Sequence, residues 1–273
     1  MTEDLTALYK KYFDVHCDIG SEQSLLAEAL KLRYQVYCVE CPYEDMSAFP
    51  DGMERDQYDV RALHSLLVHR ASQQVAGTVR LIFPDRRAPM GSLPIDTLCT
   101  DARLRDQTLL PRHGLAEVSR FAISKLFRRR LEDVPTPTGV GPLWSEYRQA
   151  EQRRVPHLSL GLAQAMVFNS RRHGITHWVA EMEPALLRMY AKLGLHWNKV
   201  GPLVDFHGRR QPCYACIEEM LQRNRQERPD IWRLITDPGG CADSLGWEVP
   251  KKVPYERRSP QVEEQGHAQH GRD

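Results

Sequence analysis

A carboxylate, a hydroxyl group and a guanidinium group lie close together in the chain, at Glu117, Ser119 and Arg120. They belong to residues 116–124, whose apolar side chains predict a strand in the middle of a sheet. On a regular strand, Glu117 and Ser119 point to one face and Arg120 points to the other. A carboxylate beside a reaction cleft can accept the proton of an attacking amine, directly or through water, which makes Glu117 a candidate general base. The alternative is a salt bridge between Glu117 and an arginine.

Two Cys-x-x-Cys pairs, Cys38 with Cys41 and Cys213 with Cys216, have a ligand spacing that is common in four-cysteine zinc sites. The pairs are far apart in the chain, and the second pair lies on an expected strand, where residues i and i+3 face opposite sides. We therefore expect buried free thiols and no metal. The seven cysteines, an odd number, also favour a reducing compartment over a disulfide framework.

Apolar periodicity and turn residues predict the elements that must position these side chains. The expected helices are at residues 22–37, 158–172, 184–193 and, interrupted by Pro229, 218–236. The expected strands are within 11–18, at 65–69, 75–83, 116–124 and 178–181, and in a closing hairpin of 196–204 with 212–217. Because the early strands are joined by short turns, the fold class is α+β, with a mixed, mostly antiparallel sheet.

The composition is that of an ordinary globular chain of 273 residues with a formal net charge of +1. This charge gives no general reason to expect nucleic acid or an acidic membrane as a partner. No run approaches the roughly 18 apolar residues of a membrane span, and the acidic start, residues 1–5, lacks the layout of a signal peptide. We therefore expect a cytoplasmic protein with no membrane span.

The order of strand, helix, strand and helix across residues 117–194 resembles the GNAT superfamily of N-acyltransferases. The last helix ends in Tyr190-Ala191-Lys192-Leu193-Gly194-Leu195, which is similar to the tyrosine, lysine, leucine-glycine motif of that superfamily. The resemblance implies a GNAT-like fold, in which helices flank a central sheet. It also implies that Tyr190 protonates the leaving thiolate. The alternative is a tyrosine that packs on the sheet beside Leu187 and Ala191.

Four motifs in order narrow the resemblance to the acyl-homoserine-lactone (autoinducer) synthases and the related N-acyl amino acid synthases. The motifs are Leu32 to Tyr37, Glu54 to Asp59, Gly77 to Arg80 and Glu117 to Phe121. The stretch from Arg33 to Glu44 looks most like the acyltransferases associated with PEP-CTERM/exosortase systems. Autoinducer synthases usually carry a tryptophan after the first motif. Here the chain reads Cys41-Pro42-Tyr43, which argues against S-adenosylmethionine as the amine donor.

The resemblance implies roles for two sets of residues. The substrate-binding set is Arg33, Tyr37, Asp56, Asp59, Arg80 and Arg120. Arginine binds a carboxylate with two hydrogen bonds and aspartate holds an ammonium group, so this mixture suits an amino acid or a similar zwitterion. The alternative is a buried ion-pair network that orders the N-terminal loop, and both can hold together. The catalytic set is Glu117, Ser119 and Tyr190, and backbone N–H groups at a bulge would bind the thioester carbonyl at Phe121, Ala122 and Ile123.

The acyl donor is expected at the start of the helix at 158–172, where GNAT enzymes hold the pyrophosphate of coenzyme A. Gly161 and Ala163 fit the motif of those enzymes, whereas Leu158 replaces its polar first residue. Such a loop can hold the single phosphate of an acyl carrier protein, and local basic patches steer an acidic partner of this kind. The arginine clusters are at 128–130, 153–154 and 171–172. The alternatives are packing of Gly161 against the sheet and ordinary solvated arginines.

We expect residues 1–222 to form the GNAT-like domain, with an irregular insert at 128–157, and residues 223–273 to form a C-terminal helix and a mobile tail. The expected activity is transfer of a long acyl group from an acyl carrier protein to the amine of an amino acid or similar small molecule, with no tightly bound cofactor. Acyl-coenzyme A is the alternative donor. Homoserine-lactone synthesis, an ordinary acetyl-coenzyme A enzyme and a non-catalytic acyl-carrier or lipid-binding module are the alternative functions.

Overall fold

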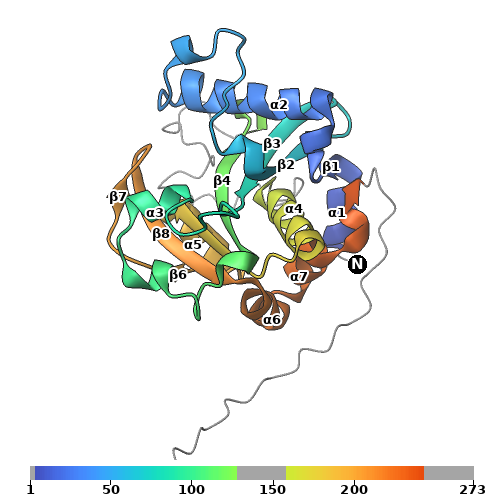
Figure 1. Cartoon of the computed structure of the whole chain (residues 1–273). Helices are drawn as coiled ribbons and strands as arrows, with labels where there is room; N and C mark the ends of the chain where they lie inside the picture. Colours follow the sequence, from blue (N-terminus) through green and yellow to red (C-terminus); the bar gives the residue numbers. More distant parts are fainter. Residues whose placement is uncertain (1–3, 128–157, 243–273) are drawn as a thin grey trace, which may run out of the picture.

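The computed structural model describes residues 4–127 and 158–242 of the chain. The strands of this part form a mixed sheet in the order β6-β8-β5-β4-β3-β2-β1-β9, and β7 also pairs with β8 (Figure 1). In chain order they are β1 (Phe13–His16), β2 (Ala62–His69), β3 (Gln74–Ile82), β4 (Leu115–Ile123), β5 (His177–Met182), β6 (Asn198–Lys199), β7 (Val204–Asp205), β8 (Arg209–Cys216) and β9 (Cys241–Ala242). The pairs β4–β5 and β1–β9 are parallel and the other pairs are antiparallel. The predicted α+β class with a mostly antiparallel sheet is confirmed.

Helices lie on both faces of this sheet (Figure 1). They are α1 (Leu5–Tyr12), α2 (Gln23–Tyr34), α3 (Pro94–Leu98), α4 (Leu158–His173), α5 (Pro184–Lys192), α6 (Ile217–Glu227) and α7 (Pro229–Thr236). On one face, α2 packs against β2, β3 and β4, and its Leu32 belongs to the same apolar cluster as Ala122 of β4. On the other face, α4 packs against β1 to β4, in the cluster that contains Phe121 and Ile123.

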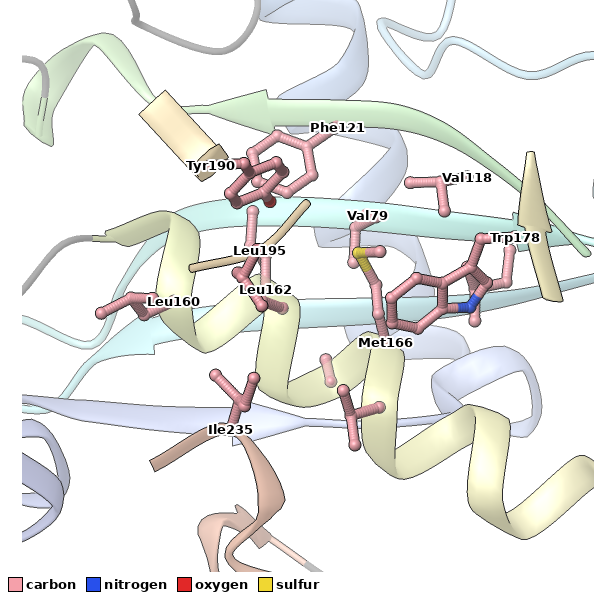
Figure 2. Packing of buried hydrophobic residues seen from close by; sticks show 14 of the residues in the cluster. Val79, Val118, Phe121, Leu160, Leu162, Met166, Trp178, Tyr190, Leu195 and Ile235 are labelled. Atoms are coloured by element: carbon pink, nitrogen blue, oxygen red, sulfur yellow. The ribbon is translucent and has the colours of Figure 1, made fainter. Parts of the chain in front are cut away.

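The helix α4 is the centre of the larger core because other elements enclose it. Every residue from Ser159 to Ser170 is buried, and α7 covers the side that faces away from the sheet. Figure 2 shows this packing, with side chains of α4 among those of the sheet and α7. Two buried amide groups of the helix are hydrogen-bonded: Gln164 Nε2 donates to the carbonyl of Leu234 at 2.9 Å, and Asn169 Nδ2 donates to Ser65 Oγ at 2.9 Å. The helix stops at Gly174, whose φ of +68° suits a glycine.

The helix α2 continues into a π-helical turn, Gln35–Glu40. The side chains of Val36, Tyr37 and Cys38 in this turn are buried. The Tyr37 hydroxyl donates to the carbonyl of Phe121 at 3.4 Å, so the turn is held against β4. π-helical turns are rare and often mark functional sites. The turn and the part of β4 that it contacts are therefore candidates for a functional site.

The two ends of the described chain differ from the sequence-based expectation. The strand predicted within 11–18 occupies only Phe13–His16, and the helix α1 precedes it. Residues 238–242, predicted to belong to a mobile tail, instead form a 3₁₀ turn and β9, which lies parallel to β1. The tail prediction is wrong here because the partner of β9 lies more than 200 residues earlier in the chain, beyond the reach of local patterns.

The predicted domain boundary at residue 222 falls inside α6. The next helix, α7, places Ile231, Leu234 and Ile235 in the core that also contains α4. Helices on both sides of that boundary therefore share one core. The predicted insert, the arginine clusters at 128–130 and 153–154, and the chain beyond Ala242 lie outside the described residues.

The cysteines follow the prediction only in part. Cys17 and Cys241 form a disulfide, whereas the sequence favoured free thiols. The prediction is wrong for this pair because the pairing of β1 with β9 brings the two residues together. None of the four Cys-x-x-Cys residues forms a disulfide within the described residues, and only Cys216 is not fully buried. Within residues 4–127 and 158–242, no three His, Cys, Asp or Glu side chains are arranged to hold a metal, and no helix is long and apolar enough to cross a membrane.

Candidate active site

A bulge interrupts β4 at the residues that the sequence singled out. The register between β3 and β4 shifts between Thr78 and Arg80, so that Arg120 and Phe121 of β4 lie opposite a single residue of β3. The backbone of Arg120 has a φ of +49°, a left-handed value that is uncommon for a residue with a side chain. A bulge of this kind bends the strand and redirects its side chains. The bulge implied by the family resemblance is therefore present.

The bulge puts Ser119 and Arg120 on the same face of the sheet. Ser119 Oγ accepts a hydrogen bond from Arg80 Nη2 at 3.1 Å, and Arg120 bonds to Glu54 on that side. Phe121 packs on the opposite face, in the core around α4. The prediction that Arg120 points away from Ser119 is therefore wrong, because the additional residue breaks the alternation of the strand.

The pairing of β4 with β5 ends just before this bulge. The parallel register runs from Leu115–His177 to Glu117–Val179, although β4 continues to Ile123 and β5 continues to Met182. Beyond Glu117, β5 keeps its partner β8 on the other side. The second half of β4 therefore presents an edge that is not laddered to β5, and the candidate oxyanion-binding residues lie on this half.

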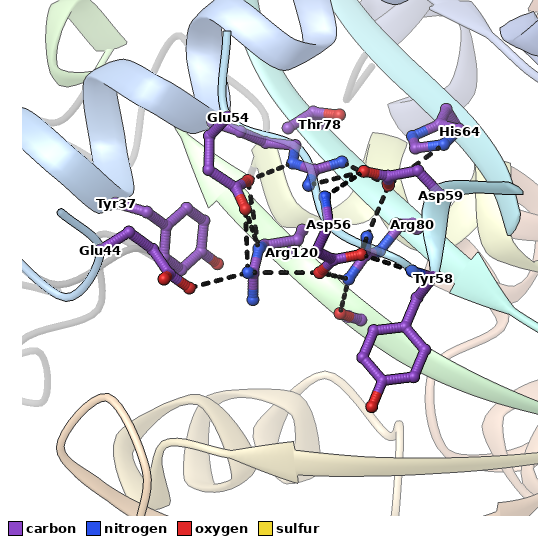
Figure 3. Close-up of polar contacts among 12 residues, drawn as sticks. Tyr37, Glu44, Glu54, Asp56, Tyr58, Asp59, His64, Thr78, Arg80 and Arg120 are labelled. Atoms are coloured by element: carbon purple, nitrogen blue, oxygen red, sulfur yellow. Dashed lines mark hydrogen bonds and ion pairs between the residues drawn. The ribbon is translucent and has the colours of Figure 1, made fainter. Parts of the chain in front are cut away.

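A dense ion-pair network covers the α2 face of the sheet beside the bulge (Figure 3). Its innermost member is Arg33 of α2, which is fully buried. Arg33 Nε lies 2.5 Å from Glu54 Oε2, and its Nη1 and Nη2 donate to the two carboxylate oxygens of Asp59 at 2.7 and 3.2 Å. Such forked bonds fix the guanidinium in one orientation.

Arg80 of β3 forms the second layer of the network. Its Nη1 donates to Asp56 Oδ1 at 2.6 Å and to Asp59 Oδ1 at 2.5 Å. Its Nη2 donates to Asp56 Oδ2 at 2.8 Å and to the hydroxyl of Ser119. Arg80 therefore ties the loop before β2 to the bulged strand.

Arg120 forms the outer layer of the network. Its Nη2 lies 2.9 Å from Glu54 Oε1, 2.9 Å from Glu44 Oε1 and 3.4 Å from Asp56 Oδ2. The guanidinium carbon lies 5.0 Å from the centre of the Tyr37 ring, within the range of a cation–π contact. Arg120 thus joins three carboxylates that come from the segment between α2 and β2.

The network keeps its inner carboxylates, Glu54 and Asp59, ionised. Burial by itself would raise the pKa of Glu54, but Arg120 and Arg33 outweigh it and lower that pKa to about 2. Burial also opposes ionisation of Asp59, and Arg33 and Arg80 bring its pKa well below the usual value. His64 of β2 lies behind this layer, and burial together with Arg33 lowers its pKa to about 4. The imidazole of His64 is therefore neutral at physiological pH.

The structure brings the predicted substrate-binding set together, but only part of it can meet a substrate. The side chains of Arg33, Arg80 and Glu54 are enclosed, with 1 % exposure each. Those of Glu44 and Asp56 are 27 % and 23 % exposed, and that of Arg120 is 10 % exposed. The buried members therefore position the loop, while Glu44, Asp56 and Arg120 form the accessible edge.

A group of rings stands beside this accessible edge. His207, in the turn between β7 and β8, stacks on Tyr43 with a centroid distance of 5.2 Å. Its Nε2 lies 3.3 Å from Glu44 Oε1. Because burial and the cations Arg120 and Arg210 lower its pKa to about 4, His207 is neutral at physiological pH. The β7–β8 turn thus reaches across to the segment that follows α2.

Glu117 lies at the last residue pair between β4 and β5 and is 1 % exposed. Its Oε2 accepts a hydrogen bond from the backbone N–H of Ile95 at 3.0 Å. Its second partner is the carboxyl group of Glu181 on β5. Burial, and next the charge of Glu181, raise the pKa of Glu117 well above its ordinary value. In the described part of the chain, the predicted alternative of a Glu117–arginine salt bridge is not formed.

Tyr190 of α5 lies on the opposite face of β4 from Glu117. Its ring meets Phe121 edge to face, with centroids 6.2 Å apart (Figure 2). The hydroxyl is buried without a hydrogen-bond partner in the described residues, and burial raises its pKa. A buried hydroxyl that lacks a partner is costly, so a tyrosine at this position, where a phenylalanine would pack equally well, favours a role beyond packing.

The residues of β4 that were predicted to bind the acyl donor lie on both faces of the sheet. Phe121 and Ile123 belong to the core around α4, and Ala122 faces α2. Ala163 lines a small apolar cavity with Tyr190 and Trp197.

Gly161 has a clear packing role. An added Cβ would lie 2.1 Å from the hydroxyl oxygen of Tyr9, which donates to the carbonyl of Leu158. The close approach of α1 to α4 therefore explains why residue 161 is a glycine, and no contact with a phosphate is needed to explain it. This is the alternative that the sequence left open for Gly161.

Several residues of the site were not among those predicted. Glu54 and Glu44 lie inside the quoted motifs, so their acidity among the arginines was a usable signal. Glu181 is the charged residue in the otherwise apolar stretch 178–182 of β5, which is a weaker signal of the same kind. His64 and His207 had no signal in the sequence, because only the folded chain places them beside the network.

Comparisons with known proteins agree with this architecture. Residues 32–133 match the model of a family described as "Acetyltransferase (GNAT) domain". No curated protein sequence matches the chain. Among solved structures, the chain is similar to the CoA-dependent acyl-homoserine lactone synthase BjaI with bound SAM and isopentyl-CoA (17% identity, TM-score 0.51, 78% of this chain and 88% of that one). It is also similar to TofI in complex with an inhibitor and MTA (22%, 0.51, 84% and 99%) and to the AHL synthase LasI (18%, 0.51, 86% and 98%). These likenesses show that the fold is GNAT-like.

Proposed function

We propose that this chain, which carries a GNAT acyltransferase domain, transfers an acyl group from a thioester carrier to the amine of an amino acid or a similar zwitterion. The observation that carries the proposal is the bulge of β4 at Arg120. At this point a strand edge without a β5 partner lies between the carboxyl group of Glu117 on one face and the hydroxyl of Tyr190 on the other. A base, an edge of backbone N–H groups and an acid are the three parts that thioester aminolysis needs.

The accessible edge of the ion-pair network is suited to a zwitterionic acceptor. Arg120 offers a guanidinium to a carboxylate, and Glu44 and Asp56 offer carboxylates to an ammonium group. Arg33 and Arg80 hold these groups in place from below, so little reorganisation is required when the acceptor binds. The stacked Tyr43 and His207 would border the same site.

The proposed reaction begins when the acceptor amine has lost a proton and attacks the thioester carbon. The carboxylate of Glu117 accepts the second amine proton, directly or through water. Backbone N–H groups at residues 121–123 stabilise the oxyanion. The bond between carbon and sulfur then breaks, and Tyr190 gives its proton to the thiolate. Ser119, which accepts a hydrogen bond from Arg80, lies between the base and the network and orients the amine.

The proposed donor is an acyl carrier protein that carries a long acyl chain. The side chains around Tyr190 are apolar, which suits contact with an acyl chain, although the cavity that they enclose is small. Leu158 in place of a polar residue favours a carrier protein over coenzyme A. A link to exosortase systems rests on the motif from Arg33 to Glu44 alone.

The proposal is tested by incubating the purified chain with acyl carrier protein thioesters, or acyl-coenzyme A thioesters, of increasing length and a panel of amino acids. Release of free thiol and the mass of the product are measured together. We expect N-acyl amino acids and faster turnover with the carrier protein. Lactone products would move the assignment to homoserine-lactone synthesis. Absence of both thiol release and amide with every donor would refute the proposal and favour a binding module.

The acceptor site is tested with Arg120→Lys, which keeps the charge but loses the planar fork. We expect the KM for the acceptor to rise about tenfold or more, because one good charge-assisted bond is worth about 1.5–3 kcal/mol. The matched control is Arg171→Lys, at the exposed end of α4, which should leave the KM unchanged. An Arg120→Lys enzyme with an unchanged KM would remove Arg120 from the acceptor site.

A further inference from the structure

Glu181 has no role in the scheme above, yet it lies beside the proposed base. Glu117 is in register with Val179, so Glu181 lies two residues further along the same face of the neighbouring strand. The carboxyl groups of Glu117 and Glu181 lie within hydrogen-bonding reach of each other. Two carboxylates repel and neither has a proton to donate, so a hydrogen bond at this position requires one proton between them.

The surroundings of the pair contain charges, but those charges are engaged elsewhere. Arg80 on β3 bonds to Asp56 and Asp59, and Arg210 on β8 forms an ion pair with Glu183. On α3, Asp96 forms an ion pair with Arg112 and so adds a negative charge near the pair. The thiol of Cys213 on β8 is buried, and Glu181 helps to raise its pKa, so it stays neutral.

The two carboxyl groups differ in their contacts and their access to solvent. Glu117 is 1 % exposed and holds the N–H of Ile95. Glu181 is partly exposed as a residue, whereas its Oε1 is buried without a hydrogen-bond partner in the described part of the chain. Burial raises the pKa of both groups, and the charge on Glu181 raises that of Glu117 further. Glu117 is thus the inner member of the pair and Glu181 the outer one.

We propose that Glu117 and Glu181 hold one proton between them and act as a single base, in which Glu181 is a positioning residue that works through Glu117. This inference rests on the proposed acyl transfer. In each cycle the pair starts with one proton and takes a second from the nitrogen as the bond between nitrogen and acyl carbon is completed. The bond between carbon and sulfur breaks, and the sulfur takes a proton from Tyr190. Glu181 then returns one proton to solvent, and Tyr190 takes one proton from solvent, so both groups regain their starting states.

The test compares the wild type with Glu181→Gln, which keeps the size of the side chain and its ability to donate a hydrogen bond. Removing the second acidic group makes Glu117 a weaker base. We therefore expect the acid limb of the kcat–pH profile to move down by about one pH unit and the plateau to fall about tenfold. Val179→Ala, on the same face of β5, is the matched control and should leave the limb in place. An unmoved limb in Glu181→Gln would overturn the proposal.

A second measurement does not depend on turnover. In protein labelled with carbon-13 glutamate, the carboxyl carbon of Glu117 should titrate well above the ordinary range of a glutamate, and its midpoint should fall by about one unit or more in Glu181→Gln. An equal midpoint in both proteins would show that no proton is shared. Absence of turnover with every donor would refute the acyl transfer and with it the role as a base, whereas the titration would still decide whether the pair shares a proton.

Discussion

The substitution Glu54→Gln isolates the contribution of the ion-pair network to stability. Glu54 is completely buried and accepts hydrogen bonds from Arg33 and Arg120. Glutamine has the same shape and keeps one carbonyl oxygen as an acceptor, but it has no charge. The variant therefore resembles the wild type with Glu54 protonated, and it leaves two buried guanidinium groups without their central counter-ion.

The magnitude follows from the pKa of Glu54, which the two arginines lower from 4.5 to about 2. One pH unit corresponds to about 1.4 kcal/mol, so the ionised form contributes about 3 kcal/mol to folding stability at neutral pH. This agrees with the roughly 3–5 kcal/mol that is lost when one partner of a buried ion pair is removed. We expect Glu54→Gln to unfold in urea with a free energy about 3 kcal/mol below that of the wild type at pH 7.

The pH dependence has a definite sign. A carboxyl group with a lowered pKa in the folded state stabilises the protein above its unfolded pKa, and this contribution is lost as the pH falls towards the folded value. The difference between Glu54→Gln and the wild type should therefore be full at pH 7 and shrink between about pH 4.5 and 2. A difference below about 0.5 kcal/mol at pH 7, or one that does not shrink in acid, would refute this account of the network.

Three further predictions concern residues outside the ion pairs. Gly161→Ala should lower the free energy of unfolding by about 1–3 kcal/mol, because its Cβ would lie 2.1 Å from the hydroxyl oxygen of Tyr9. Thermal unfolding measures this effect, and an unchanged Tm would contradict the packing role. Tyr190→Phe should keep or slightly raise stability, since the lost hydroxyl has no partner in the described residues, yet slow acyl transfer about tenfold or more; an unchanged rate would assign protonation of the thiolate to another group. His64 has a pKa of about 4 in the fold against 6.5 in the unfolded chain, so stability should fall as the pH drops from 6.5 to 4, and His64→Gln should flatten that part of a pH-dependent unfolding curve. The same slope in both proteins would show that another group causes it.

The sequence predicted the central elements well because their signals are local. Helix α4 has a long apolar run that Gly174 ends, and α5 begins at Pro184, so both helices lie close to their predicted bounds. The strand β4 was predicted for the same reason. The candidate site was predicted through ordered motifs, since Arg33, Asp56 and Arg80 meet only after α2, the loop and β3 are assembled.

Other features could not be predicted because they depend on tertiary neighbours. The orientation of Arg120 depends on a bulge that is defined against β3, and no local pattern reveals it. The neutral state of His64 depends on its burial behind the network. Glu181 becomes a partner of Glu117 only when the parallel register of β4 and β5 is known. In each case the residue can be found in the sequence, but only the fold shows which neighbour gives it a role.

The pairing of β1 with β9 also has a consequence for biosynthesis. β1 is made near the start of translation, whereas β9 emerges more than 200 residues later. Until then, one side of β1 is an open strand edge, which can pair with another chain. The nascent protein therefore holds an unprotected β-edge for most of its synthesis, and the last described strand closes it. Truncation before Cys241 should for this reason increase aggregation clearly, while the free energy of unfolding of the remaining core changes little.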